Sequence, residues 1–211
     1  MKPAAESHPS PSEPGLEKST KARASERILK SARELFYRQG IRAVGVDEIV
    51  DNAGVTKPSL YRSYPSKDEL AASYLRLYES EFWARFDAAV ARHPGDARAQ
   101  LLDYLETVAI RAVAPEYRGC GLTNAAVEYP QADHPARLVT ERHKGELLGR
   151  LRQMSAEMGA EDPELLGDSL FLLLEGTLVS SQIFRAGSPS ANIARAATLL
   201  IDAAIRPPAR G

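Results

Sequence analysis

The stretch GVDEIVDNAGVTKPSLYRSYPSKDEL, residues 45–70, combines apolar residues at helical spacing with turn residues and a run of hydroxyl and cationic side chains. Apolar residues recur at helical spacing in residues 46–53, and Gly54 then supplies a turn. Thr56 is a preferred N-cap residue and Pro58 is tolerated in the first turn of a helix, which predicts a second short helix after the turn. Two short helices joined by a glycine-containing turn form a helix-turn-helix motif.

The second short helix is predicted to have two different faces. Leu60 and Tyr64 point inward, together with Val55. The outward face combines hydroxyl groups with cations, which are the groups that contact base edges and phosphates in the major groove of DNA. The residues that form this outward face and its flanks are Lys57, Ser59, Tyr61, Arg62 and Ser63.

Positive charge is concentrated around this motif. The whole chain has a net charge of −1, whereas residues 18–67 contain eleven Lys or Arg and five acidic residues, a local net charge of +6. Ser66 and Glu69 form the capping-box pattern S-x-x-E, and the free N–H groups of such a helix start, with Lys67 beside them, suit a phosphate. We therefore expect this end of the molecule to bind the DNA backbone.

Helical spacing continues through the rest of the chain. The sequence contains no sustained alternation of apolar and polar residues, so it predicts an all-α fold of about nine helices. The helix that begins after Ser66 changes its apolar face midway, which places a domain boundary along it. We expect a disordered tail in residues 1–20, a three-helix helix-turn-helix domain in residues 21–70, and a larger helical domain in residues 71–211.

Composition and motifs exclude several classes of protein. The single cysteine, Cys120, excludes an intramolecular disulfide framework and fits a reducing interior. Apolar runs are too short for a membrane span or a signal peptide, so we expect a cytoplasmic protein without a membrane partner. No nucleotide-binding or hydrolase motif is present, and His134 and His143 would lie on opposite sides of a helix. We expect no metal, no cofactor and no enzymatic activity.

Three features of the larger domain suit a small-molecule cavity. Aromatic residues cluster on the linking helix, although core packing is the simpler explanation for each of them. Glu175 interrupts the apolar run FLLLEGTLV and must be paired, neutral, solvated or ligand-facing. Cys120 follows a basic residue at a helix start, so it is either a redox or electrophile sensor or an inert buried thiol. The candidate ligand-binding residues are Tyr78, Phe82, Trp83, Phe86, Cys120, Asn124, Glu128 and Glu175.

The segment ILKSARELFYRQGIRAVGVDEIVDNAGVTKPSLYRSYPSKDEL, residues 28–70, resembles the TetR (tetracycline-repressor) family of bacterial transcriptional regulators. The rest of the chain is similar to that family only in its architecture. The resemblance implies a homodimer formed by the last two helices, about residues 162–185 and 190–205, and a ligand cavity above the DNA-binding domain. By position, it implies that DNA is contacted by Gly45, Thr56, Lys57, Pro58, Ser59, Tyr61, Arg62, Ser63 and Lys67.

Two positions depart from the pattern of that family. Gly45 stands where a Ser or Thr helix cap is usual, which removes a hydroxyl that could bind phosphate. Ser63 stands where His is frequent, which changes a phosphate contact.

These patterns together predict a one-component regulator that binds a palindromic operator in double-stranded DNA through residues 45–67. We expect a repressor that a small-molecule effector releases from the operator. The alternative is a helical small-molecule-binding protein or enzyme whose N-terminal hairpin does not bind DNA. The local charge of +6 and the outward hydroxyl groups favour the regulator.

Overall fold

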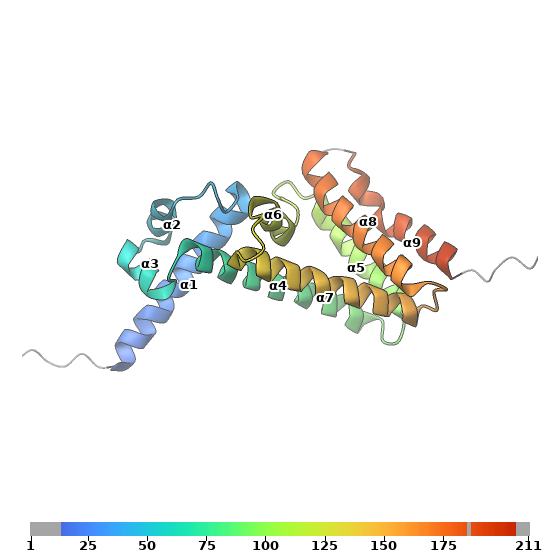
Figure 1. The fold of residues 1–211 in the computed structure, drawn as a ribbon, viewed down its shortest axis with the longest axis horizontal. Helices are drawn as coiled ribbons and strands as arrows, with labels where there is room; N and C mark the ends of the chain where they lie inside the picture. Colours follow the sequence, from blue (N-terminus) through green and yellow to red (C-terminus); the bar gives the residue numbers. More distant parts are fainter. Residues whose placement is uncertain (1–13, 185–186, 206–211) are drawn as a thin grey trace, which may run out of the picture.

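The computed structural model describes residues 14–184 and 187–205. Within these ranges the chain forms nine α-helices, one 3-10 helix and no strand, which confirms the all-α prediction (Figure 1). The helices are α1 (Pro14–Gln39), α2 (Val46–Ala53), α3 (Lys57–Ser63), α4 (Lys67–Arg92), α5 (Ala97–Ala112), α6 (Gly121–Glu128), α7 (Pro135–Glu157), α8 (Pro163–Ile183), η1 (Pro189–Asn192) and α9 (Ile193–Ala204).

The first helix begins earlier than the composition predicts. α1 starts at Pro14, within the expected tail of residues 1–20, while residues 1–13 of that segment lie outside the described residues. The physical reason is local. Proline is favoured at the first position of a helix, and the residues that follow it include strong helix formers such as Glu17, Lys18 and Lys21.

α1, α2 and α3 form a separate unit at one end of the molecule (Figure 1). Gly54 ends α2 in the left-handed region, with φ 59°, which a residue with a side chain rarely adopts. Its carbonyl accepts a hydrogen bond of 2.9 Å from the Arg27 guanidinium of α1. Ile49 of α2 and Leu60 of α3 are fully buried against α1, and this burial fixes how α3 is presented.

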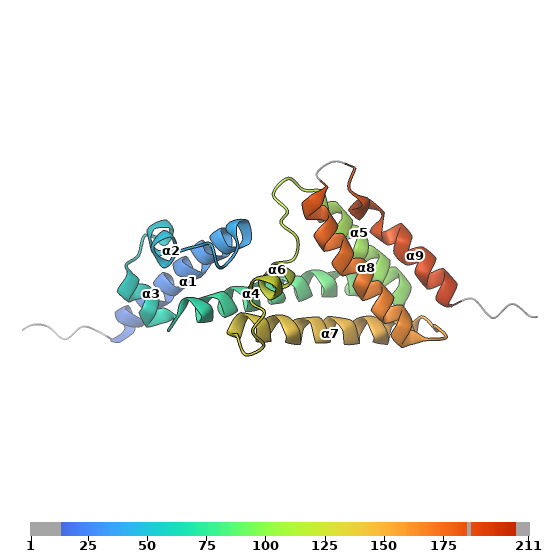
Figure 2. The same ribbon diagram turned by 45° about the horizontal axis from the view of Figure 1, so that its top comes forward.

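α4 connects this unit to the remaining helices (Figure 2). Its N-cap is Ser66, whose hydroxyl accepts a hydrogen bond from the Glu69 N–H at 3.1 Å, as the capping pattern predicts. Near its start, Tyr74 packs edge-on against Phe36 of α1, with ring centroids 5.7 Å apart. Farther along, Phe82 packs in the same way against Tyr104 of α5. The apolar face of α4 therefore shifts along the helix because the first part of α4 packs on α1 and a later part packs on α5.

The larger domain is built from α4 outward, and α5, α6 and α7 pack directly on α4. α7 lies against both α4 and α8, and α9 packs on α5 and α8 (Figure 2). Leu147 and Leu151 of α7 and Leu170 and Leu174 of α8 are buried in this core. Among the described helices, none is both long and apolar enough to cross a membrane.

Candidate functional site

The inward face of α3 anchors this short helix in the N-terminal unit. Thr56 is its N-cap residue, as predicted, and Leu60 has no exposed surface. Tyr64 follows the helix, and its hydroxyl accepts a hydrogen bond of 3.0 Å from the Ser25 hydroxyl and donates one of 3.3 Å to the Ser25 carbonyl. These contacts hold α3 on α1, so the orientation of its outward face is set by α1.

The outward face of α3 brings the predicted groove contacts together. Thr56, Lys57 and Arg62 are exposed, and Tyr61 has half of its surface exposed. Ser59 joins this face, because its hydroxyl accepts hydrogen bonds from the Arg62 guanidinium at 2.9 Å and from the Thr56 hydroxyl at 3.2 Å. Exposed contacts of this kind exchange readily for contacts with base edges and phosphates.

Lys57 has an acidic neighbour that the sequence pattern did not reveal. Its Nζ lies 2.6 Å from the Asp47 carboxylate, and both side chains are more than half exposed. The hydrogen bond and the charge of Asp47 raise the pKa of Lys57, so this lysine stays protonated. Because an exposed ion pair contributes little free energy, a DNA phosphate can replace Asp47 at small cost.

The groups predicted to contact phosphate differ in whether they already have hydrogen-bond partners within the protein. The Lys67 ammonium donates to the Arg42 carbonyl at 3.3 Å, and partial burial lowers its pKa. The Ser63 hydroxyl donates to the Ser59 carbonyl of its own helix at 3.2 Å, so it must rotate before it can donate to a phosphate. Gly45 is exposed at the N-cap of α2, where no side chain caps the helix.

Glu128, one of the expected ligand-binding residues, joins α6 to the turn that follows α1. Its Oε2 accepts a hydrogen bond of 2.7 Å from the Arg42 N–H, in the turn that follows α1. The Arg42 guanidinium in turn donates to the Glu128 carbonyl at 3.1 Å. A second link joins α1 to the loop before α6, because the Tyr37 hydroxyl accepts a hydrogen bond of 2.9 Å from the Arg118 N–H. Sequence spacing gave no signal for these contacts.

Most of the expected aromatic ligand residues form part of the core. Phe82 and Phe86 are almost completely buried and pack against Tyr104 of α5. His143 of α7 completes the cluster, with its ring 4.6 Å from that of Phe82 and 5.4 Å from that of Trp83. This arrangement favours core packing as the role of Phe82 and Phe86.

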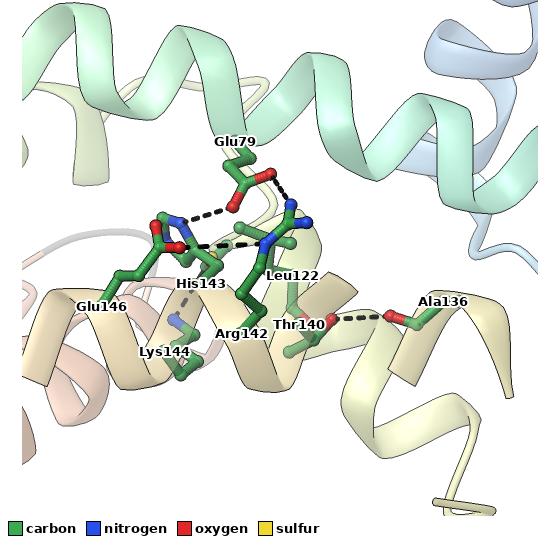
Figure 3. Close-up of polar contacts among 9 residues, drawn as sticks. Glu79, Leu122, Ala136, Thr140, Arg142, His143, Lys144 and Glu146 are labelled. Carbon is green, nitrogen blue, oxygen red and sulfur yellow. Dashed lines mark hydrogen bonds and ion pairs between the residues drawn. The ribbon is translucent and has the colours of Figure 1, made fainter. Parts of the chain in front are cut away.

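His143 is a polar side chain inside this aromatic cluster. It is fully buried, and neither ring nitrogen has a hydrogen-bond partner within the described part of the chain. Glu79 is near, 3.8 Å from Nδ1, but its carboxylate is bound by Arg142 at 2.6 Å (Figure 3). Burial, with the positive charges of Lys144 and Arg142, lowers the pKa of His143 from 6.5 to about 4.

Glu175, the acid in the apolar run, is paired within its own chain. Its Oε1 lies 2.5 Å from the Lys144 ammonium, and its Oε2 accepts a hydrogen bond of 2.8 Å from the Thr123 hydroxyl. The ammonium also lies 3.7 Å from the sulfur of Cys120, which is buried. Burial alone would lower the pKa of Lys144, but Cys120 and Glu175 outweigh it and raise that pKa. Pairing therefore explains how this carboxylate is tolerated.

The expected ligand-binding residues do not line one common cavity. Asn124 and Glu128 line a hollow of about 480 Å³ between α1 and α6, and Tyr78 lines one of about 320 Å³ between α1, α4 and α5. Trp83 lies at the edge of an open hollow of about 640 Å³. Four of the expected residues line none of these three hollows, namely Phe82, Phe86, Cys120 and Glu175.

Comparison with known proteins agrees with the geometry of α1–α4. A family profile described as bacterial regulatory proteins of the tetR family matches residues 28–74. A solved structure of a TetR-type transcriptional regulator from Streptomyces avermitilis is 33% identical, with a TM-score of 0.72, over 86% of this chain and 97% of that one.

Two curated relatives match the DNA-binding end. The transcriptional activator FasR of Mycolicibacterium smegmatis is 46% identical over 51 residues, 24% of this chain and 23% of that protein. The transcriptional repressor KstR2 of Mycobacterium tuberculosis is 36% identical over 59 residues, 28% of this chain and 30% of that protein. The chain thus spans less than a third of the length of these curated relatives, whereas the Streptomyces structure is matched over nearly its whole length. From the fold, the exposed face of α3 and these similarities together, we conclude that the chain belongs to the TetR family of bacterial transcriptional regulators.

Proposed function

We propose that residues 21–70 bind a palindromic operator in double-stranded DNA, and that residues 71–211 dimerise and receive a small-molecule effector. The observation that carries this proposal is the outward face of α3, where Thr56, Lys57, Ser59 and Arg62 lie together and exposed or half-exposed. An α-helix fits the major groove, and hydroxyl and guanidinium groups on its outward face read base edges there. Tyr61, Ser63 and Lys67 position the helix on phosphates.

A homodimer through α8 and α9 is supported by apolar side chains that the single chain leaves exposed. On α8, Leu165, Leu172 and Ile183 each have more than three-fifths of their surface exposed, and on α9 so does Leu199. The three α8 residues are separated by seven and eleven positions, about two and three helical turns, so they lie on one side of the helix. Exposed apolar side chains gathered on one side of a helix suit an interface, and a second copy of the chain would cover them.

Dimerisation also provides the mechanism of regulation. Two copies of α3 must meet half-sites separated by about one turn of DNA, about 34 Å. An effector that binds more tightly to a dimer state in which the two copies of α3 are at a different distance shifts the population toward that state, which does not fit the operator. The ratio of the effector's affinities for the two states sets how much of the operator is released. We propose that the protein acts in the cytoplasm and usually as a repressor; the sign of regulation follows from the position of the operator relative to the promoter.

The direct test of DNA binding is the double substitution Lys57→Ala with Arg62→Ala. Both side chains are exposed, so the helical fold should persist in circular dichroism while DNA retention is lost. The matched control is Arg76→Ala with Arg150→Ala, which removes the same total charge from α4 and α7, away from α3. Retention of DNA by the first variant, at the level of the control, would show that this face of α3 does not carry DNA binding. Failure of the folded, unmodified protein to retain DNA would favour the alternative of a helical ligand-binding protein or enzyme with a structural hairpin.

A further inference from the structure

The hollow between α1, α4 and the end of α5 has a composition that points to a class of ligand. Its volume is about 320 Å³, and it lies between the DNA-binding unit and the larger domain. Its lining combines arginines with tyrosines, namely Arg33, Arg38, Arg85 and Arg111 with Tyr37, Tyr74 and Tyr78, and its acids are Glu34, Glu81 and Glu116.

Two of the four arginines in this hollow are already paired. The Arg33 guanidinium binds both oxygens of Glu81, at 2.6 and 2.9 Å. Arg38 lies 3.8 Å from Glu116, and both of these side chains are largely exposed. These pairs use two of the three acids of the hollow, and the third, Glu34, is exposed on α1.

The other two arginines lack an acid of their own. Arg85 reaches only Glu81, at 4.0 Å, and Arg33 already occupies that carboxylate. The Arg85 Nε is buried and has no hydrogen-bond partner among the described residues. The Arg111 guanidinium lies 5.7 Å from the centre of the Tyr117 ring and has no ion pair within residues 14–184 and 187–205. A buried N–H without an acceptor is costly, so this site suits an added acceptor group.

The tyrosines supply a surface for the body of such a ligand. Tyr37 and Tyr78 stack with their rings 6.2 Å apart and nearly parallel, and Tyr74 packs edge-on against Tyr78. Aromatic surface with a few convergent polar groups is the usual character of a small-molecule site. Arginine is the residue best suited to bind a planar carboxylate.

We infer that this hollow is a binding site for an organic monocarboxylate with an apolar body. Arg85 and Arg111 hold the carboxylate, and Tyr37, Tyr74 and Tyr78 contact the apolar part. The inference deepens the proposed function and rests on it in one respect, because it gives the effector its chemical class. It also refines the place of the effector: the site lies where α1 of the DNA-binding domain meets residues 71–211, and not within residues 71–211 alone.

The position of the hollow explains how such a ligand would affect DNA binding. Tyr37 belongs to α1, which holds α3 in place, whereas Arg85 belongs to α4 and Arg111 to α5. The affinity for a ligand that touches all three helices depends on the spacing between α1 and α4. By linkage, the bound ligand changes the population of states with different positions of α3.

The test is calorimetric titration of the purified full-length chain with matched pairs of probes. The pairs are benzoate with benzyl alcohol, 2-naphthoate with 2-naphthylmethanol, and octanoate with 1-octanol. We expect at least one carboxylate to bind 10-fold or more tightly than its alcohol. Arg85→Gln and Arg111→Gln should each weaken that binding at least 10-fold, while Arg76→Gln, on an exposed part of α4, should leave it unchanged.

Three results would overturn the inference: no carboxylate of the three binds, the alcohols bind equally well, or Arg76→Gln has the same effect as the other two variants. Operator binding by the same preparations separates the two proposals. If the operator is bound and no carboxylate is, only this inference fails; if carboxylate binds and no DNA is bound, only the proposed function fails. When both bind, saturating carboxylate should weaken operator binding several-fold in the unmodified chain and not in Arg111→Gln; unchanged operator affinity would refute the regulatory role of the site.

Discussion

The burial of one polar side chain, His143, affects how the stability of this protein depends on pH. His143 is enclosed by Phe82 and Trp83, and Arg142 holds the nearest acid, Glu79. The imidazole is therefore neutral in the folded chain at physiological pH, because its pKa is lowered to about 4. In the unfolded chain the same imidazole has its ordinary pKa of about 6.5.

Lowering the pH should therefore destabilise the protein through His143. Between about pH 6.5 and pH 4 the unfolded chain binds a proton that the folded chain does not, so the free energy of unfolding falls by up to about 3 kcal/mol across this window. Above about pH 6.5, His143 is neutral in both the folded and the unfolded chain, so it causes no further change in the free energy of unfolding. Urea unfolding of the unmodified chain and of His143→Leu between pH 4 and 8 measures the difference. Parallel profiles for the two proteins would show that His143 does not titrate in this way.

At the scale of helices, glycine geometry fixes the motif that presents α3. Gly54 has φ 59°, and a Cβ placed there would lie 2.5 Å from the Arg27 guanidinium. Gly45, nine residues earlier, has φ −82°, and a Cβ there would meet nothing within 4 Å. The two glycines of the motif therefore have opposite tolerance for a side chain.

Gly54→Ala should lower the free energy of unfolding by about 1–2 kcal/mol, because a side chain in the left-handed region is strained. Gly45→Ser is the matched control, and it should raise the free energy of unfolding by about 0.3 kcal/mol, because Ser caps a helix slightly better than Gly. Thermal unfolding of both variants tests the pair. Equal effects of the two substitutions would contradict the turn geometry described for α2 and α3.

Helices were predictable from sequence where local residues decide them. Gly54 and Ser66 mark helix ends in the structure as they do in the sequence, because caps act within one turn. The link between Arg42 and Glu128 and the pairing of Lys144 with Glu175 were not predictable. Each joins residues far apart in the chain, and only the packing of whole helices brings them together. For the same reason, the expected ligand residues are spread over several hollows and the core, and only Asn124 and Glu128 share a hollow among those described.

At the scale of the whole molecule, the charge distribution separates two surfaces. Residues 18–67 have a net charge of +6 in a chain whose net charge is −1, while α8 and α9 expose apolar side chains. A charged surface at one end suits DNA, and an apolar surface at the other suits a second copy of the chain.

If α8 and α9 form the proposed dimer interface, Leu172→Glu with Leu199→Glu should yield a monomer, because each glutamate would place a charge in that interface. Leu138→Glu, on an exposed position of α7, is the control and should leave the dimer intact. Analytical ultracentrifugation measures the mass directly. A double variant that sediments as a dimer would place the interface elsewhere.

Operator affinity should fall steeply with salt, since each DNA-binding unit neutralises several phosphates. For about six phosphate contacts per dimer, the affinity should fall by about 10³-fold between 50 and 200 mM salt. Fluorescence anisotropy of a labelled operator over this range measures the slope. An affinity that is indifferent to salt would contradict binding through Lys57, Arg62 and Lys67.

Operator binding through α3 is tested by selection of bound DNA from a random duplex pool, at moderate salt, with sequencing of the retained fraction. We expect one inverted repeat whose half-sites lie about one helical turn apart, about 34 Å, and loss of that enrichment in the Lys57→Ala, Arg62→Ala double variant. Failure of the correctly folded protein to enrich any sequence would contradict operator binding.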